Sequence, residues 1–101
     1  MPSFYWRKII MNLNIQKVPI PLRIGEHHTS VCGGIVVGLS LGTNNYEQMV
    51  DLIVIADIGN INHPSSKFLV TSEWMVISSI PKKYVGNVTY NGLMYHVLEM
   101  E

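Results

Sequence analysis

The sequence has 101 residues, with seven basic and seven acidic side chains, so its formal net charge is zero. Hydrophobic residues make up 48% and charged residues 14% of the chain, which excludes a disordered chain, since disorder needs low hydrophobicity and high net charge. The absence of a basic excess argues against a protein that binds nucleic acid through bulk charge. The length fits a single β-rich domain over residues 1–101 with a small buried core.

The first predicted strand covers residues 13–24, where apolar residues alternate with polar residues or proline. The alternation slips by one position at Gln16 and Lys17, which predicts a bulge or a turn at that point. Pro19 and Pro21 remove two backbone donors. We therefore expect this strand at the edge of a sheet.

Two further strands are predicted in the middle of the chain. Residues 35–41 form a β-branched run bounded by glycines, and residues 52–56 are continuously apolar between two aspartates. The second run predicts a strand that is buried on both faces. Between the two runs, the turn-forming residues 42–45 and a helix-start pattern predict one helical turn over residues 46–50.

The C-terminal half contains a predicted loop, a β-prone segment and a hairpin. The loop covers residues 59–66, and the β-prone segment covers residues 68–80, with Ser72-Glu73 as a candidate interruption. Asn91-Gly92 is a two-residue turn signal that pairs residues 84–90 with residues 93–98. The predicted fold is mostly β: a small barrel or rolled antiparallel sheet of five to six strands, SH3-like or OB-like, with at most one short helix.

The single cysteine, Cys32, cannot form a disulfide within the chain, which favours a reducing compartment. The N-terminus places aromatic residues before its basic pair, the reverse of the order in a secretory signal peptide. The longest strongly apolar stretch, residues 49–58, falls far short of the ~20 residues that cross a bilayer. We expect a cytoplasmic protein without membrane attachment. Met11 is an alternative start, in which case residues 1–10 are an extension that precedes the fold.

The polar residues give no complete site for metal binding or catalysis. His27 and His28 lie in a polar segment that reads as a loop, and adjacent strand residues would in any case face opposite sides. No second cysteine or metal-ligand spacing accompanies them. We interpret Cys32 as a small, buried apolar residue and Glu73 as a carboxylate that faces solvent while Trp74 faces inward. The catalytic alternative is a reactive pair of Cys32 with a histidine, or a desolvated Glu73 carboxylate that acts as a general acid or base. We predict no metal, no cofactor and no catalytic residue.

The predicted binding residues form an aromatic and basic cluster near the N-terminus. Phe4, Tyr5, Trp6 and Arg7 are of the types that dominate binding energy at protein interfaces. With so few charges, part of the apolar surface is expected to be exposed, and large apolar patches mark interfaces. The leading prediction is a non-enzymatic module that binds a protein partner or forms a homodimer by strand addition, as an inhibitor or regulator from a phage or other mobile element. The same cluster is able to stack on single-stranded bases, a possibility that we do not favour.

Four segments follow one another in an order similar to that in toxins of the MazF/PemK family: residues 25–26, 34–37, 52–58 and 77–86. Residues 77–86 resemble a family segment of the form Ile/Val-x-Thr-Ile-Asp-Lys-x-x-Leu-Gly, which follows a strand in these toxins. The resemblance implies an SH3-like barrel and an endoribonuclease toxin, which is the alternative function. Two glycines replace the family's Arg-Pro, and Asp57-Ile58-Gly59 stands where the family has threonine or serine, so no catalytic residue is carried over.

Overall fold

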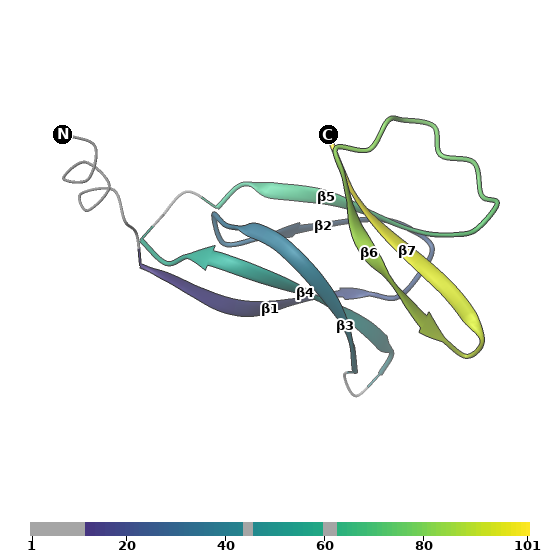
Figure 1. Ribbon diagram of the computed structural model, residues 1–101, viewed down its shortest axis with the longest axis horizontal. Helices are drawn as coiled ribbons and strands as arrows, with labels where there is room; N and C mark the ends of the chain where they lie inside the picture. The colour runs from purple at the N-terminus through teal and green to yellow at the C-terminus, as the bar shows by residue number, and fades with distance from the viewer. Residues whose placement is uncertain (1–11, 44–45, 60–62) are drawn as a thin grey trace.

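Seven β-strands make up the regular structure of the computed structural model, which describes residues 12–43, 46–59 and 63–101. They form two antiparallel sheets, one in the order β1-β4-β3 and the other in the order β2-β5-β7-β6 (Figure 1). The strands are β1 (Leu13–Pro21), β2 (Gly25–Ser30), β3 (Ile35–Thr43), β4 (Gln48–Asp57), β5 (Ser65–Ser72), β6 (Lys83–Tyr90) and β7 (Leu93–Met100).

The expectation of a mostly β fold is confirmed, and that of a small barrel or rolled sheet of five to six strands is matched only roughly. The described residues form seven strands in two antiparallel sheets that do not close into a barrel. The additional strand is β2, whose polar residues had indicated a loop and which becomes a strand by pairing with β5. β4 begins at Gln48, so the helical turn expected over residues 46–50 does not form. No helix in the described part of the chain is long and apolar enough to cross a membrane.

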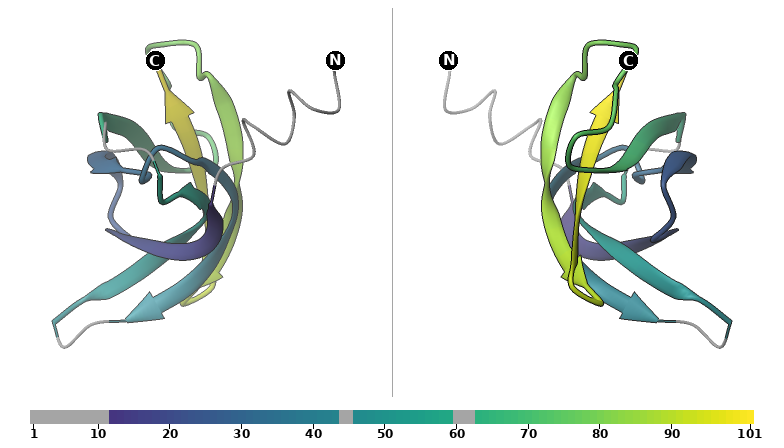
Figure 2. Two further views of the ribbon diagram at one scale, coloured as in Figure 1. Left: turned by 90° about the vertical axis from the view of Figure 1, so that its left-hand side faces the viewer. Right: turned by 90° about the vertical axis from the view of Figure 1, so that its right-hand side faces the viewer.

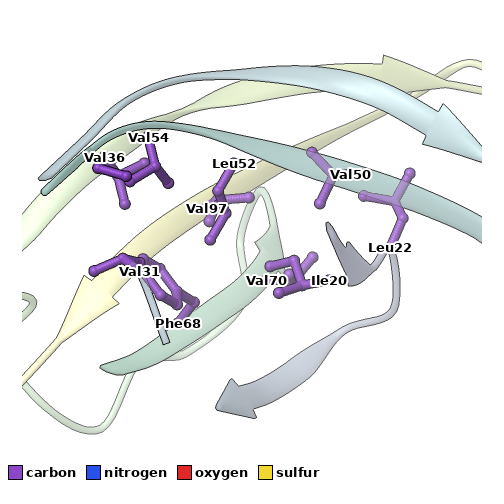
Figure 3. Close-up of a cluster of buried hydrophobic side chains, with 11 residues drawn as sticks. Ile20, Leu22, Val31, Val36, Val50, Leu52, Val54, Phe68, Val70 and Val97 are labelled. Atoms are coloured by element: carbon purple, nitrogen blue, oxygen red, sulfur yellow. The ribbon is translucent and has the colours of Figure 1, made fainter. Parts of the chain in front are cut away.

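The two sheets face each other across one core of branched apolar side chains (Figure 3). Phe68 of β5 is the largest of the fully buried side chains and packs in this cluster with Val97 of β7. Opposite them, β4 contributes Val50, Leu52 and Val54, none of which is exposed. The alternation of buried and half-buried residues along β4 corrects the expectation of a strand covered on both faces.

β1 lies at the edge of its sheet, as its two prolines predicted, because its only strand partner is β4. The expected bulge at residues 16–17 is wrong, since the pairing runs without a break from Leu13–Asp57 to Pro21–Met49. The slip in the alternation has another cause. Ile20 points into the core, whereas Leu13 and Ile15 are exposed and lie in the opposite phase of the same regular strand.

The sheets approach each other where β6 lies against β3, and Figure 2 shows this corner from both ends of the molecule. The Lys83 Nζ donates a hydrogen bond to the carbonyl oxygen of Val36, at 2.5 Å. A bulge between Val36 and Gly38 in β3 and another between Tyr84 and Gly86 in β6 interrupt the two registers near this contact. The corner therefore sets where the start of β6 lies relative to the three-stranded sheet.

Candidate functional site

A connection rich in apolar residues joins β5 to β6 over residues 73–82, which we call the Trp74 loop. The β-prone segment expected over residues 68–80 ends as a strand at Ser72. Three large apolar side chains of the loop are almost fully exposed: Trp74 at 98%, Val76 at 94% and Ile80 at 87%. The loop projects beyond the ends of the strands on the right of Figure 1. It is thus an apolar protrusion rather than part of the core.

Trp74 has an unusual backbone conformation, with a φ of +70°. A bulky residue other than glycine rarely adopts such an angle, and the strain is about 1–3 kcal/mol. The expectation that Trp74 faces inward while Glu73 faces solvent assumed that the strand continued through both residues. Because β5 ends at Ser72, that alternation does not apply and the indole lies in solvent.

The tip of the β6–β7 hairpin lies beside the start of the Trp74 loop. Asn91 and Gly92 both have positive φ, at +51° and +78°, as the predicted two-residue turn requires. The next two residues, Leu93 and Met94, are exposed apolar side chains. An open pocket forms between the loop and the hairpin tip, lined by Ser72, Glu73, Trp74, Gly92, Leu93 and Met94.

A chain of polar contacts runs from the outer face of β6 and β7 to the first residue of the Trp74 loop. The Tyr84 hydroxyl is 2.8 Å from His96 Nδ1 and accepts a hydrogen bond from Asn87 Nδ2 at 2.9 Å. On the other side of the imidazole, His96 Nε2 lies 3.8 Å from Glu73 Oε1, an ion pair when the ring is protonated. These contacts connect the start of the loop to the sheet.

The polar chain contains groups that are able to exchange protons, since it joins a carboxylate, an imidazole and a phenol. The two lysines closest to it in the sequence are engaged elsewhere. Lys82 lies 3.8 Å from the carboxylate of Glu99, and the Lys83 ammonium is bonded to a backbone carbonyl of β3. The arrangement therefore supplies acid–base groups without a lysine directed at them.

A second exposed apolar surface lies on the outer face of the three-stranded sheet. The register places Ile15 of β1 and Ile35 of β3 on either side of Ile55 in the central strand β4. Ile15 is 73% and Ile35 60% exposed. We call this surface the sheet patch, and it consists of Leu13, Ile15, Ile35, Ile53 and Ile55. A shallow hollow at its edge is lined by Leu13, Gly33, Gly34, Ile35, Ile55 and Asp57.

Phe4, Tyr5, Trp6 and Arg7, the binding residues predicted from the sequence, lie outside the described residues. Their role stays a prediction. The sequence reasoning missed both exposed surfaces that the structure does describe. The sheet patch could have been found from the change of phase in the apolar–polar alternation at residues 16–17. That change means that apolar side chains lie on both faces of one strand. The exposure of Trp74 depends on its positive φ, and the amino-acid composition of the loop does not predict that angle.

The other candidate residues do not come together in one site. His27 and His28 are consecutive residues of β2, and His27 Nε2 is 2.8 Å from the Arg23 carbonyl oxygen. Cys32 is half-buried in the turn before β3, where its thiol donates to Gln16 Oε1 at 3.5 Å. Within the described ranges, no group of three or more histidine, cysteine, aspartate or glutamate side chains is placed to hold a metal ion.

Comparison of the chain with protein-family models, with curated proteins and with solved structures gives no match. The resemblance to the MazF/PemK toxins therefore stays a prediction from the sequence.

Proposed function

We propose that the protein is a non-enzymatic binding module that docks onto another protein through the Trp74 loop and the adjacent hairpin tip. The observation that carries the proposal is the 98% exposure of Trp74 on a strained backbone. Tryptophan is the residue type most enriched among those that dominate binding energy at interfaces. Such strain persists at sites where the surrounding structure enforces it, and these sites are often functional.

The two ends of the Trp74 loop are attached to the four-stranded sheet. At its start, Glu73 lies beside His96 of β7. At its end, the Lys82 backbone N–H donates to the Glu99 carbonyl oxygen at 2.8 Å, and the side chains of the same two residues form an ion pair. A loop held at both ends loses less conformational entropy on binding than a free one, which favours its use as a docking element.

The chemistry of the loop suggests the chemistry of its partner. Its most exposed apolar side chains are an indole, a valine and an isoleucine, and the chain has no net charge. An apolar pocket on a protein complements such a tip, whereas nucleic acid would need more positive charge than the loop supplies through Lys82, which lies beside the carboxylate of Glu99. A small docking protein of this kind fits the expected inhibitor or regulator from a phage or other mobile element. Its binding should depend little on salt, because salt screens mainly exposed charges.

The proposal is tested by affinity capture with the tagged full-length protein in lysate of its source organism, with and without nuclease. We expect a nuclease-resistant protein partner that is retained by the wild type and by Tyr46→Ala, a control at an aromatic residue exposed elsewhere. Trp74→Ala should lose the same partner. Equal retention by all three proteins would contradict docking through the loop.

RNA cleavage is the second proposal, in line with the resemblance to the MazF/PemK family. The polar chain of Glu73, His96 and Tyr84 favours it, because a histidine between a carboxylate and a phenol is able to act as acid and base. Purified protein incubated with total RNA tests this proposal directly. Cleavage by the wild type that is lost in His96→Gln would support it, and intact RNA together with unimpaired growth on expression would contradict it.

A further inference from the structure

The sheet patch has a symmetry that the Trp74 loop lacks. Three isoleucines stand in one row across the sheet, with Ile55 of the central strand flanked by Ile15 on one side and Ile35 on the other. All three are on the face turned away from the core, since their neighbours Val36 and Val54 are buried. The outward face of an antiparallel sheet ordinarily carries polar residues. This row of three identical side chains is therefore unexplained by the fold alone.

We propose that the sheet patch packs against the sheet patch of a second copy, in a face-to-face homodimer. A two-fold axis along β4 places Ile15 of each copy over Ile35 of the other and brings the two Ile55 side chains together. Such an isologous interface needs a self-complementary surface. The isoleucine row meets this need because it reads the same from either edge of the sheet.

Pairing through the face is favoured over pairing through the edges of this sheet. On β1, Pro19 and Pro21 lack the backbone donors that strand addition uses. On β3, the edge is approached by β6, and the Val36 carbonyl already accepts a hydrogen bond from Lys83. The homodimer by strand addition that the sequence suggested is thus replaced, for these two edges, by packing of the open faces.

The size of the patch sets the expected strength of the dimer. The strands are spaced about 4.8 Å apart with about 3.3 Å per residue, so the two residues each from β1 and β4 and the one from β3 give an apolar area on the order of a few hundred Å². A standard interface covers about 800 Å² on each partner, which is more than the apolar patch supplies. The rest of the buried area must therefore come from polar residues around the patch. We therefore expect a weak dimer, with a dissociation constant of about 10 μM or more.

The dimer would also bear on the proposed docking function. The start of β1 and the end of β4, which carry much of the sheet patch, lie at the left of Figure 1, and the Trp74 loop lies at the right. Rotation about an axis along β4 leaves positions along that axis unchanged, so both Trp74 loops would lie toward the same end of the dimer. Two loops that engage one multivalent partner would gain avidity without any new contact. The dimer itself does not depend on this function.

Sedimentation velocity of the full-length protein, from about 1 to 300 μM, tests the proposal. We expect the wild type to pass from monomer to dimer over this range. Ile15→Lys and Ile35→Lys, at exposed positions in the row, should weaken the association at least about tenfold. Val76→Lys is the matched control, because it adds the same charge at an exposed apolar position of the Trp74 loop and should dimerise as the wild type does.

Circular dichroism and thermal denaturation establish that the lysine variants are folded before they are compared. A wild type that stays monomeric at the highest concentration would overturn the proposal. So would a dimer that survives both substitutions in the isoleucine row. A dimer that Val76→Lys dissociates while Ile15→Lys does not would place self-association in the Trp74 loop and would equally overturn it.

Discussion

The sheet patch and the Trp74 loop are both exposed and apolar, yet their exposure has different physical origins. In the sheet patch, the strand period obliges every second residue to face away from the core, and the pairing of β1, β4 and β3 fixes those positions. In the Trp74 loop, no ladder requires the indole to point outward, and its backbone is strained. Exposure therefore follows from the fold in one region and from local backbone conformation in the other.

The two regions should also respond differently to perturbation. The sheet patch rests on backbone pairing between three strands, continuous from β1 to β4 and broken by one bulge between β4 and β3, so its shape does not depend on any single side-chain contact. The Trp74 loop is held at its ends by a few exposed or half-exposed contacts, such as those of Glu73 and Lys82. Regions with few buried contacts open most easily, so the loop should be the less stable of the two.

The largest expected effect is on the support of the sheet patch. A Cβ atom at Gly34 would lie 1.8 Å from the carbonyl oxygen of Ile55, a backbone atom that cannot move without disturbing β4. We expect Gly34→Ala to lower the free energy of unfolding by about 3 kcal/mol or more, as measured by urea denaturation. In the control Gly92→Ala, no neighbour obstructs the Cβ but φ is positive, and the loss should be about 1 kcal/mol. Equal losses in the two variants would show that the close approach at Gly34 does not limit stability.

The next effect separates binding from stability in the Trp74 loop. Glycine adopts positive φ without strain, so Trp74→Gly should leave the free energy of unfolding within about 1 kcal/mol of the wild type. The same change should weaken binding of the captured partner by at least about 2 kcal/mol, or thirtyfold, since it removes the central indole. Calorimetric titration and thermal denaturation measure the two quantities. A variant that binds as tightly as the wild type would remove Trp74 from the interface.

A smaller effect concerns the contact between β6 and β3, which joins the two sheets. Lys83→Met removes the donor to the Val36 carbonyl oxygen and should lower the free energy of unfolding by about 1–3 kcal/mol, because a hydrogen bond from a charged donor is lost. Lys67→Met removes a partly exposed ion pair with Glu26 and should change stability by less than about 1 kcal/mol. If the two variants are equally stable, the corner between β3 and β6 contributes little.

The smallest effect is confined to the start of the Trp74 loop. Glu73→Gln removes the contact of the Glu73 carboxylate with His96, an ion pair when the ring is protonated, and should change the free energy of unfolding by no more than about 1 kcal/mol. Hydrogen exchange should nevertheless become faster at the backbone amides of residues 73–76, while the amides of β4 stay as protected as before. Faster exchange throughout the protein would contradict the assignment of this contact to the loop alone.

Local sequence signals predicted part of the fold correctly. Asn91-Gly92 located the β6–β7 hairpin, because two residues with positive φ favour these side chains. Pro19 and Pro21 placed β1 at an edge, because a missing donor excludes a central position. Both signals act through the backbone of the residues concerned, so the rest of the fold was not needed to interpret them.

Other features depend on partners that are distant in the sequence. β2 reads as a polar loop until β5 is present to pair with it, and β4 reads as buried on both faces until it is known that only one face is covered. The Trp74 loop has the composition of a strand, and the local signal that the ladder ends is the polar pair Ser72-Glu73, at which β5 stops. The candidate site could not be predicted because exposure is a property of the assembled sheets.

The strand order has a consequence for the way in which the chain folds. β1 has no partner until β4 exists, and β2 has none until β5 exists, so only the β3–β4 and β6–β7 hairpins close locally. Proteins dominated by such non-local pairings fold in milliseconds to seconds rather than in microseconds. During synthesis, the chain up to Thr43 would leave the ribosome with Ile20, Leu22 and Val36 uncovered, although all three are buried in the folded protein. The period before β4 emerges is therefore the one in which the nascent chain is most prone to aggregation.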